Sequence, residues 1–314
     1  MAQAARRRLG PCGLDLEAVY QVLRQTLGGG HRHPAASPSC LAHGFGALKD
    51  WSLPAFAERF VKAGFAVVRF DYRGFGKSGG QPRRVVDGKE HVKDWVAAID
   101  AISKRTDVDG QRLGIWGTSY SGGQVLVAGA ERPDVVKAVS AQVPFVNGLS
   151  SSLKFPLKYQ PMAAWYALRD MMRSDTETPL YVPTVAKDAF AALVCDECVE
   201  GYAKLHPQGV GDEGKVAARV FMTLPFFFPG SRAADIKAPT LIIAAENDGL
   251  IPVERVRAAA RAMAAISKVR APFGYSPPAS KSTTFSEPRS SSPGSLGVTT
   301  FDDGPAAKYS EMSA

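Results

Sequence analysis

The sequence predicts an α/β protein whose mostly parallel sheet is flanked by helices. Three observations predict this fold class. Short β-rich runs alternate with amphipathic segments from about residue 38 to 270. An apolar stripe at helical spacing fills the interval between two of these runs. The chain has 314 residues with 45% hydrophobic composition, which is enough to bury a full core.

The strand candidates are four short apolar runs, at residues 66–71, 112–117, 135–143 and 240–246. Residues 88–104 carry the helical stripe, so they should form a helix that packs on the sheet. Further helices should follow Ser119 and Pro252, and the proline suits a first helical position.

Three segments interrupt the alternation. Residues 148–232 gather aromatic residues, methionines and prolines, and they should form a helical cap that either packs as a plain layer or lines a substrate pocket. Residues 1–37 form a divergent N-terminal segment, in which residues 14–27 have helical apolar spacing. Residues 271–314 are rich in Ser and Pro and should be disordered, since they offer little apolar surface to bury.

Composition excludes several classes of function. The formal net charge of +8 comes from scattered Lys and Arg, apart from Arg6, Arg7 and Arg8, which argues against a nucleic-acid partner. No apolar run approaches the ~18 residues of a membrane span, and the start lacks the apolar stretch of a signal peptide. We therefore expect a cytoplasmic protein, with an organelle as the alternative because the start is Arg-rich.

The four cysteines are too few and too dispersed for a disulfide framework, so we expect them to be reduced. Cys195 and Cys198 form a C-x-x-C pair, with His206 eight residues further on. A structural zinc site needs four ligands, and the chain has no second pair. The sequence therefore predicts no metal and no cofactor.

One serine stands at a predicted junction between a strand and a helix. In Gly117-Thr118-Ser119-Tyr120-Ser121-Gly122-Gly123, small residues on both sides allow a sharp turn that projects the Ser119 hydroxyl. The turn also directs the Tyr120 N–H toward whatever Ser119 attacks. The alternative is a small-residue turn without chemistry.

Two other loops complete a possible catalytic site. His43-Gly44-Phe45-Gly46 is a glycine-rich loop that can present the Phe45 N–H as a second donor to an oxyanion. His43 itself is expected to be structural. Asp248 ends the strong apolar run TLIIAAEND, where its carboxylate could orient a histidine or simply form an Asp-Gly turn.

These motifs together resemble the α/β-hydrolase superfamily. HGFG, FDYRGFGKSGG, GTSYSGG and AENDGLIP occur in its order and cover about residues 38–270. Within it the chain is similar to the X-prolyl dipeptidyl peptidase and cocaine-esterase-like serine hydrolases, and to fungal polyketide transferases and thiohydrolases. The resemblance implies that Ser119 is the nucleophile, Asp248 the acid, and the Phe45 and Tyr120 amides the oxyanion hole.

The base that this family places after the acid is missing. The five histidines are His31, His33, His43, His91 and His206, and all precede Asp248. His206, in the predicted cap, is a candidate base, although an exposed loop histidine is the simpler interpretation; His91 should lie on the flank of the sheet. Two unmatched ends around a matched centre favour replacement by splicing, a frame change or an incorrect gene end.

Two functions compete. The first is a serine hydrolase that cleaves a small-molecule ester, thioester or amide through a Ser119 acyl-enzyme, with a thiohydrolase or acyltransferase of secondary metabolism as one form of it. The second is a catalytically silent α/β-hydrolase-fold protein, or a truncated isoform without the triad histidine, that acts as a binding protein. A dinucleotide site at 74–79 is excluded, since no helix follows that G-x-G-x-x-G.

Overall fold

The computed structural model describes residues 14, 16–19, 36–51, 53–174, 177–205, 214–266 and 296–301. A seven-stranded sheet has the order β1-β3-β2-β4-β5-β10-β11. The strands are β1 (Leu16–Val19), β2 (Pro38–Ala42), β3 (Ala66–Phe70), β4 (Leu113–Thr118), β5 (Val136–Gln142), β10 (Thr240–Ala245) and β11 (Leu296–Phe301). Only the β1–β3 pair is antiparallel among them. The predicted fold class is therefore confirmed.

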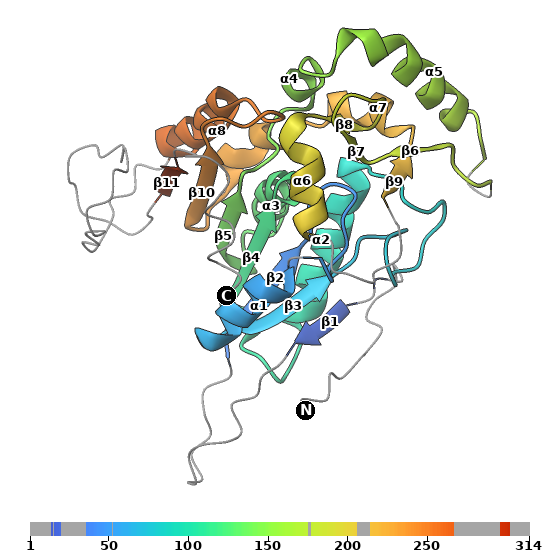
Figure 1. Cartoon of the computed structure of the whole chain (residues 1–314). Coiled ribbons are helices and arrows are strands. Elements are labelled where there is room, and N and C mark those ends of the chain that lie inside the picture. The colour runs from blue at the N-terminus through green and yellow to red at the C-terminus, as the bar shows by residue number, and fades with distance from the viewer. Residues whose placement is uncertain are drawn as a thin grey trace, which may run out of the picture.

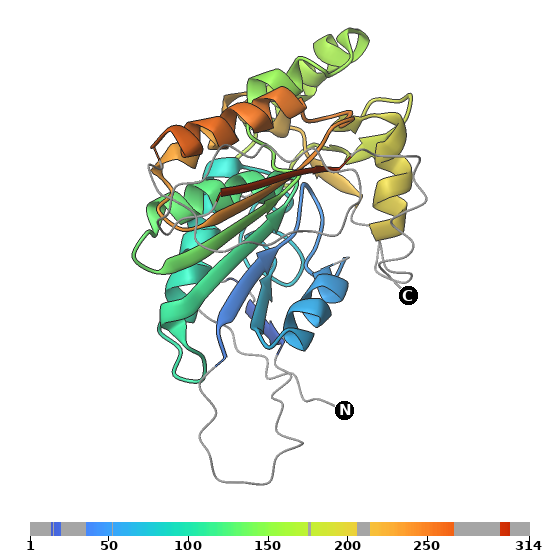
Figure 2. The ribbon, with the colours of Figure 1, turned by 90° about the vertical axis from the view of Figure 1, so that its left-hand side faces the viewer.

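Helices cover both faces of this sheet (Figure 2). They are α1 (Leu53–Lys62), α2 (Gly88–Ser103), α3 (Tyr120–Glu131) and α8 (Val253–Ile266). Helix α1 packs on one face through Leu53, Ala57 and Val61, whereas α2 and α3 pack on the other. The predicted helix over 88–104 is thus present as α2, and its N-terminus is capped by the Asp87 carboxylate, which accepts from two amides.

A cap separates β5 from β10 and lies above the sheet in Figure 1. Its elements are α4 (Gly148–Ser152), α5 (Gln160–Met171), β6 (Tyr181–Pro183), β7 (Val185–Ala186), β8 (Leu193–Val194), α6 (Asp196–Leu205), β9 (Lys215–Ala217) and α7 (Val220–Thr223), with 3-10 turns at 157–159, 224–226 and 229–235. The fully buried Asp170 of α5 anchors it, because its carboxylate accepts from the Leu180 amide and from Arg219 Nε at 2.7 and 2.8 Å. Within the described ranges, no helix is long and apolar enough to cross a membrane.

Two expectations about the chain ends are wrong where the structure describes them. Residues 16–19, predicted to continue a helical pattern, form β1 and pair with β3. Residues 296–301, predicted to be disordered, form β11 and pair with β10. In both cases a distant strand supplies the hydrogen bonds, and this pairing overrides local propensity. Apart from Leu14 and residues 36 and 37, the rest of both segments lies outside the described residues.

The tight contact between α3 and the cap predicts a stability difference between two glycines. A Cβ on Gly123 would meet the Phe145 carbonyl oxygen at 1.9 Å, whereas a Cβ on Gly201 in α6 would meet nothing within 4 Å. Gly123→Ala should therefore lower the free energy of unfolding by about 1–3 kcal/mol. Gly201→Ala should raise it by up to about 1 kcal/mol, because alanine favours the helix. Urea denaturation measures both, and equal effects would contradict the packing described.

Candidate active site

Ser119 occupies a strained turn between β4 and α3. Its φ of 55° and ψ of −119° lie where a non-glycine residue is seldom found. The Ser119 N–H donates to the Gln142 carbonyl at 2.8 Å, and the Phe145 N–H donates to the Ser119 carbonyl at 2.9 Å. Backbone bonds to the next strand and the segment beyond it therefore hold the turn that the sequence predicts.

The glycine-rich loop after β2 lies directly against this serine. A Cβ built on Gly44 would be 3.2 Å from Ser119 Cβ, which is a tight contact, and 3.6 Å from Ser119 Oγ, so glycine suits this close approach. The Phe45 carbonyl accepts a hydrogen bond from the Tyr202 hydroxyl of α6, which ties the loop to the cap. Tyr120 is the first residue of α3, so its N–H has no acceptor one turn back in the helix. The structure thus brings Phe45, Ser119 and Tyr120 together.

A cavity of about 340 Å³ lies between this turn and the cap. Phe45, Ser119 and Tyr120 line it from the sheet side, and residues 149, 151–155, 160, 163–164, 192–194, 221–222 and 224–225 line it from the cap. Most of its lining is apolar, and Lys154 is the only charged side chain among the described residues that line it. The cap therefore lines a pocket over Ser119.

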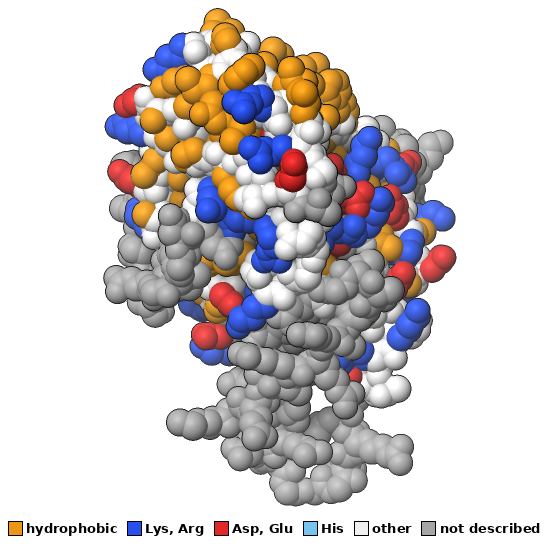
Figure 3. Space-filling model, turned by 90° about the vertical axis from the view of Figure 1, so that its right-hand side faces the viewer, with side chains coloured by type: hydrophobic (Ala, Val, Ile, Leu, Met, Phe, Trp, Pro, Cys, Tyr) orange, Lys and Arg blue, Asp and Glu red, His pale blue; other side chains and the backbone are white. Residues whose placement is uncertain are grey.

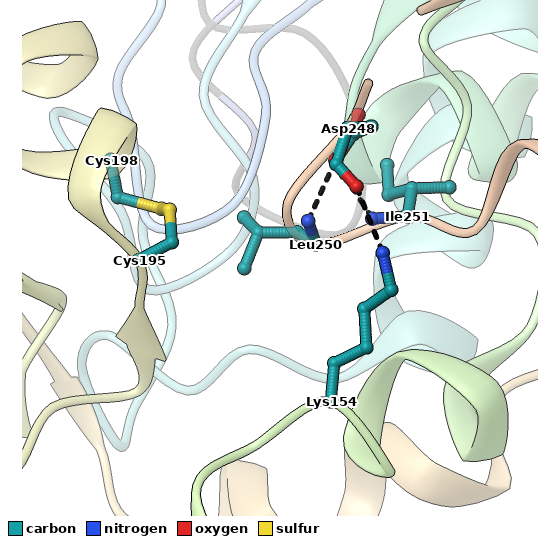
Figure 4. The surroundings of a disulfide bond; sticks show 6 residues. All are labelled: Lys154, Cys195, Cys198, Asp248, Leu250 and Ile251. Atoms are coloured by element: carbon teal, nitrogen blue, oxygen red, sulfur yellow. Dashed lines mark hydrogen bonds between the residues drawn. A yellow bond between two sulfur atoms is a disulfide. The ribbon is translucent and has the colours of Figure 1, made fainter. Parts of the chain in front are cut away.

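Asp248 lies in the loop after β10, which borders the same cavity through residues 249–251. Its Oδ1 accepts from the Leu250 and Ile251 amides, each at 2.8 Å, and its carbonyl accepts from Lys154 Nζ at 2.8 Å (Figure 4). The Asp248 side chain therefore stabilises the Asp-Gly turn, which was the alternative interpretation of this residue from the sequence. The same two amides fix the position of the carboxylate that we predict to be the acid.

Neither histidine that the structure describes forms a hydrogen bond with Ser119. His43 is buried, and its Nδ1 lies 3.0 Å from the Gly44 carbonyl oxygen. His91 is buried in α2, stacks on Tyr72 with ring centroids 4.1 Å apart, and contacts the Gln124 side-chain amide. Burial lowers the pKa of His43, and it lowers the pKa of His91 to about 3. His31, His33 and the candidate base His206 lie outside the described residues.

A buried polar network beneath the turn was not predicted from the sequence. The Tyr72 hydroxyl donates to Ser121 Oγ at 2.8 Å and accepts from Trp95 Nε1 at 3.0 Å. This network connects the loop after β3, α2 and the start of α3. Ser121 lies in the motif, but its partner Tyr72 is 49 residues away in the chain, and Trp95 is 23 residues from Tyr72.

The expectation of reduced cysteines is wrong for Cys195 and Cys198, which form a disulfide (Figure 4). Cys195 directly precedes α6 and Cys198 lies in its first turn, so their Cα atoms are 5.3 Å apart, within disulfide range. A Cβ on Gly249 would be 3.7 Å from Cys195 Cβ, so the pair lies beside the Asp248 loop. Among the described residues, no group of three or more His, Cys, Asp or Glu could hold a metal ion.

Comparison with known proteins points to the same family as the motifs. The family model of X-Pro dipeptidyl-peptidase (S15 family) matches residues 20–173. The quorum-quenching protein AidA of Acinetobacter baumannii is 38% identical over 214 residues, which cover 68% of this chain and 70% of AidA. The thiohydrolase aneE of Aspergillus aculeatus is 38% identical over 88 residues, 28% of each chain. The crystal structure of the α/β hydrolase GrgF from Penicillium sp. sh18 has a TM-score of 0.62 at 24% identity and covers 73% of this chain and 79% of GrgF.

The depressed pKa of His91 predicts a dependence of stability on pH. The unfolded chain binds a proton on this residue below about pH 6.5, but the folded state does so only near pH 3, so stability falls as pH drops through that window. His91→Phe keeps a ring beside Tyr72 and removes this contribution. Between pH 7.5 and 5.0 the variant should lose about 2 kcal/mol less than the parent in urea denaturation. If the free energy of unfolding of the parent and the variant changed equally with pH, this would contradict the burial of a neutral His91.

The disulfide predicts a mass difference in one tryptic peptide. Residues 188–204 contain both Cys195 and Cys198 and lie between two lysine cleavage sites. Without reduction this peptide should be about 2 Da lighter than the dithiol form and should resist iodoacetamide; after dithiothreitol it should take up two alkyl groups. Cys198→Ser is the control in which the difference disappears. Full alkylation of the unreduced parent would show that the pair is not bonded.

Proposed function

We propose that this chain, which belongs to the α/β-hydrolase superfamily among the relatives of the S15 peptidases, forms an acyl-enzyme on Ser119. The observation that carries the proposal is the strained Ser119 turn at the base of an apolar cavity, with the Gly44–Phe45 loop on one side and the start of α3 on the other. Acyl transfer is the chemistry that such a turn serves in this fold.

The reaction follows from these positions. Ser119 Oγ attacks the carbonyl carbon of the substrate, and its proton passes to a base. The Phe45 and Tyr120 amides stabilise the oxyanion that develops, and losing one such donor typically costs on the order of 10²–10³ in rate. The C–O or C–S bond then breaks, and the alcohol or thiol leaves with a proton. Water or a second nucleophile releases the acyl group. Asp248 orients the base in this scheme.

The cavity favours an apolar acyl group. Its cap side presents Leu, Phe, Ala and Met side chains, and Lys154 is its only charged lining residue among those described. We therefore propose a small-molecule ester or thioester with an aliphatic or aromatic acyl chain. The thiohydrolase name of one relative supports the thioester form. A cytoplasmic location and the absence of a nucleic-acid partner stay predictions.

A second function, ligand binding without turnover, is favoured because neither described histidine is bonded to Ser119 as a base. His43 contacts the Gly44 carbonyl and His91 contacts the Gln124 side chain, and neither forms a hydrogen bond with Ser119. The other three histidines lie outside the described residues. Without a base, the oxyanion donors and binding alone leave a residual acceleration of about 10³–10⁴ over water.

A fluorophosphonate separates the two functions. Folded protein should gain one adduct in intact mass, because an activated Ser119 attacks the phosphorus, and Ser119→Ala should abolish it. Ser151→Ala is the matched control, since this serine lines the same cavity outside the turn. Hydrolysis of a series of thioesters by the parent should fall at least about 10³-fold in Ser119→Ala.

Two results would contradict catalysis by Ser119. The first is the absence of any adduct on protein whose circular dichroism and melting show a folded chain. The second is labelling that persists in Ser119→Ala. In the first case, binding of acyl ligands measured by calorimetry becomes the function to establish.

A further inference from the structure

The cap carries an exposed apolar surface on its outer side. Eight of the fifteen large hydrophobic side chains that are exposed among the described residues lie within residues 149–172. We call this surface the cap face, and its most exposed members are Leu153, Leu157, Trp165, Leu168, Met171 and Met172, with 52–79% of each side chain accessible. Figure 3 shows the hydrophobic side chains gathered at the top of the molecule. Isolated exposed hydrophobic residues are ordinary, but a gathered set marks an interaction site.

The packing of α5 determines that these apolar side chains are exposed. The helix buries Ala163, Ala167 and Asp170 and packs Tyr166 against the core, whereas its other four large apolar side chains are exposed. The buried Asp170 fixes that orientation, because it accepts from the Leu180 amide and from Arg219. A helix packed only for the core shows the reverse pattern. The outward face therefore matches an apolar partner.

The charges around the cap face indicate which kind of partner binds there. Lys154, Lys158 and Arg169 are exposed within 148–174, and Arg173 is half-buried. The single described acid in that range is Asp170, which is buried and paired. Arg169 lies over the Trp165 ring at 5.2 Å, an amphipathic pairing suited to a lipid headgroup layer. The exposed acids Glu177 and Asp188 lie on neighbouring loops.

This charge pattern selects an anionic lipid surface over a second copy of the chain. A symmetric contact through the cap face would place the basic side chains of one copy against those of the other, and like charges in an interface oppose association. An anionic bilayer offers both an acyl layer for Trp and Leu and negative headgroups for Lys and Arg.

The cap face continues into the mouth of the cavity. Leu149 and Leu153 line the cavity above Ser119 and are also 52% and 73% exposed. Lys154, between them and the Asp248 loop, donates to the Asp248 carbonyl. A membrane that covers the cap face would therefore lie across this mouth.

We propose that the cap face docks on an anionic membrane surface, from which the cavity takes up an acyl substrate. Docking is independent of the chemistry at Ser119. Uptake of the substrate rests on the proposed function, and it would let an apolar acyl chain pass from lipid to cavity without crossing water.

Flotation of the full chain with vesicles tests the proposal. Vesicles of phosphatidylcholine with about 30% phosphatidylserine should bind the protein at least about tenfold more tightly than pure phosphatidylcholine, and raising the salt concentration should weaken this binding. Leu157→Asp/Leu168→Asp should reduce binding at least about tenfold, because two charges enter the apolar contact. Val199→Asp/Leu205→Asp, which adds the same two charges at exposed apolar sites on α6, is the matched control and should bind as the parent does.

A pair of charge reversals separates docking from general attraction of a cationic chain. Lys158→Glu/Arg169→Glu should weaken binding at least about tenfold, whereas Lys62→Glu/Lys104→Glu makes the same change in net charge at exposed sites of α1 and the end of α2 and should leave binding near the parent level. Equal losses in both pairs, or no preference for anionic vesicles, would overturn the proposal.

Two further measurements separate membrane docking from the chemistry at Ser119 and from self-association. Ser119→Ala should bind vesicles as the parent does, so a failure of the proposed chemistry leaves the docking result intact. Sedimentation equilibrium should show that Leu157→Asp/Leu168→Asp leaves the oligomeric state unchanged. A dimer in the parent that this variant dissociates would assign the cap face to self-association and overturn membrane docking.

Discussion

The candidate site depends on a turn that leaves almost no room for side chains around Ser119. A Cβ on Gly117 would lie 2.4 Å from the Ser121 carbonyl oxygen, and one on Gly122 would lie 2.9 Å from that of Gln142. Glycine at these positions lets β4 and α3 meet at a sharp angle. Because β4 is central in the sheet, the angle places the serine under the cap. The strain at φ 55° persists because bonds to Gln142 and Phe145 overdetermine it.

Burial determines what the polar residues beneath this turn can do. Burial raises the pKa of Asp71, but the charge of Lys49 and its hydrogen bonds to the carboxylate oppose this, and the pKa lies below its ordinary value. The pKa of His43 is lowered chiefly by burial, so the ring stays neutral beside that carboxylate. These groups hold the loop after β2 in place and are enclosed away from substrate. A base for Ser119 must therefore come from outside this network, and Ser119 stays a neutral alcohol where none is supplied.

Local motifs predicted the centre of the molecule, whereas contacts between distant residues could not be predicted. The serine turn, the Gly44–Phe45 loop and the Asp248 loop each have a short signature, and parallel strands bring their carboxyl ends to one edge of the sheet. Strand β1 and strand β11 form through pairing with β3 and β10, so their sequences alone gave the wrong state. The Cys195–Cys198 bond was missed for another reason, since the expectation rested on cellular compartment and not on the turn that joins the two residues.

In helix α5, a contact between distant residues that local sequence does not predict also bears on function. A helical apolar pattern is usually taken to face the core, but in α5 the core contact is made by two alanines, Tyr166 and Asp170, and most of the large apolar side chains face outward. The Asp170–Arg219 contact, which joins residues 49 apart, helps to fix that orientation, and no local sequence pattern predicts it. An apolar surface at a cavity mouth then needs a partner, because leaving it in water is unfavourable at about 25 cal/mol per Å². The surrounding Lys and Arg side chains oppose binding of a second copy of the chain and favour binding to anionic lipid. The buried Asp170–Arg219 ion pair, which orients α5, therefore also determines which surface lies at the entrance for an acyl substrate.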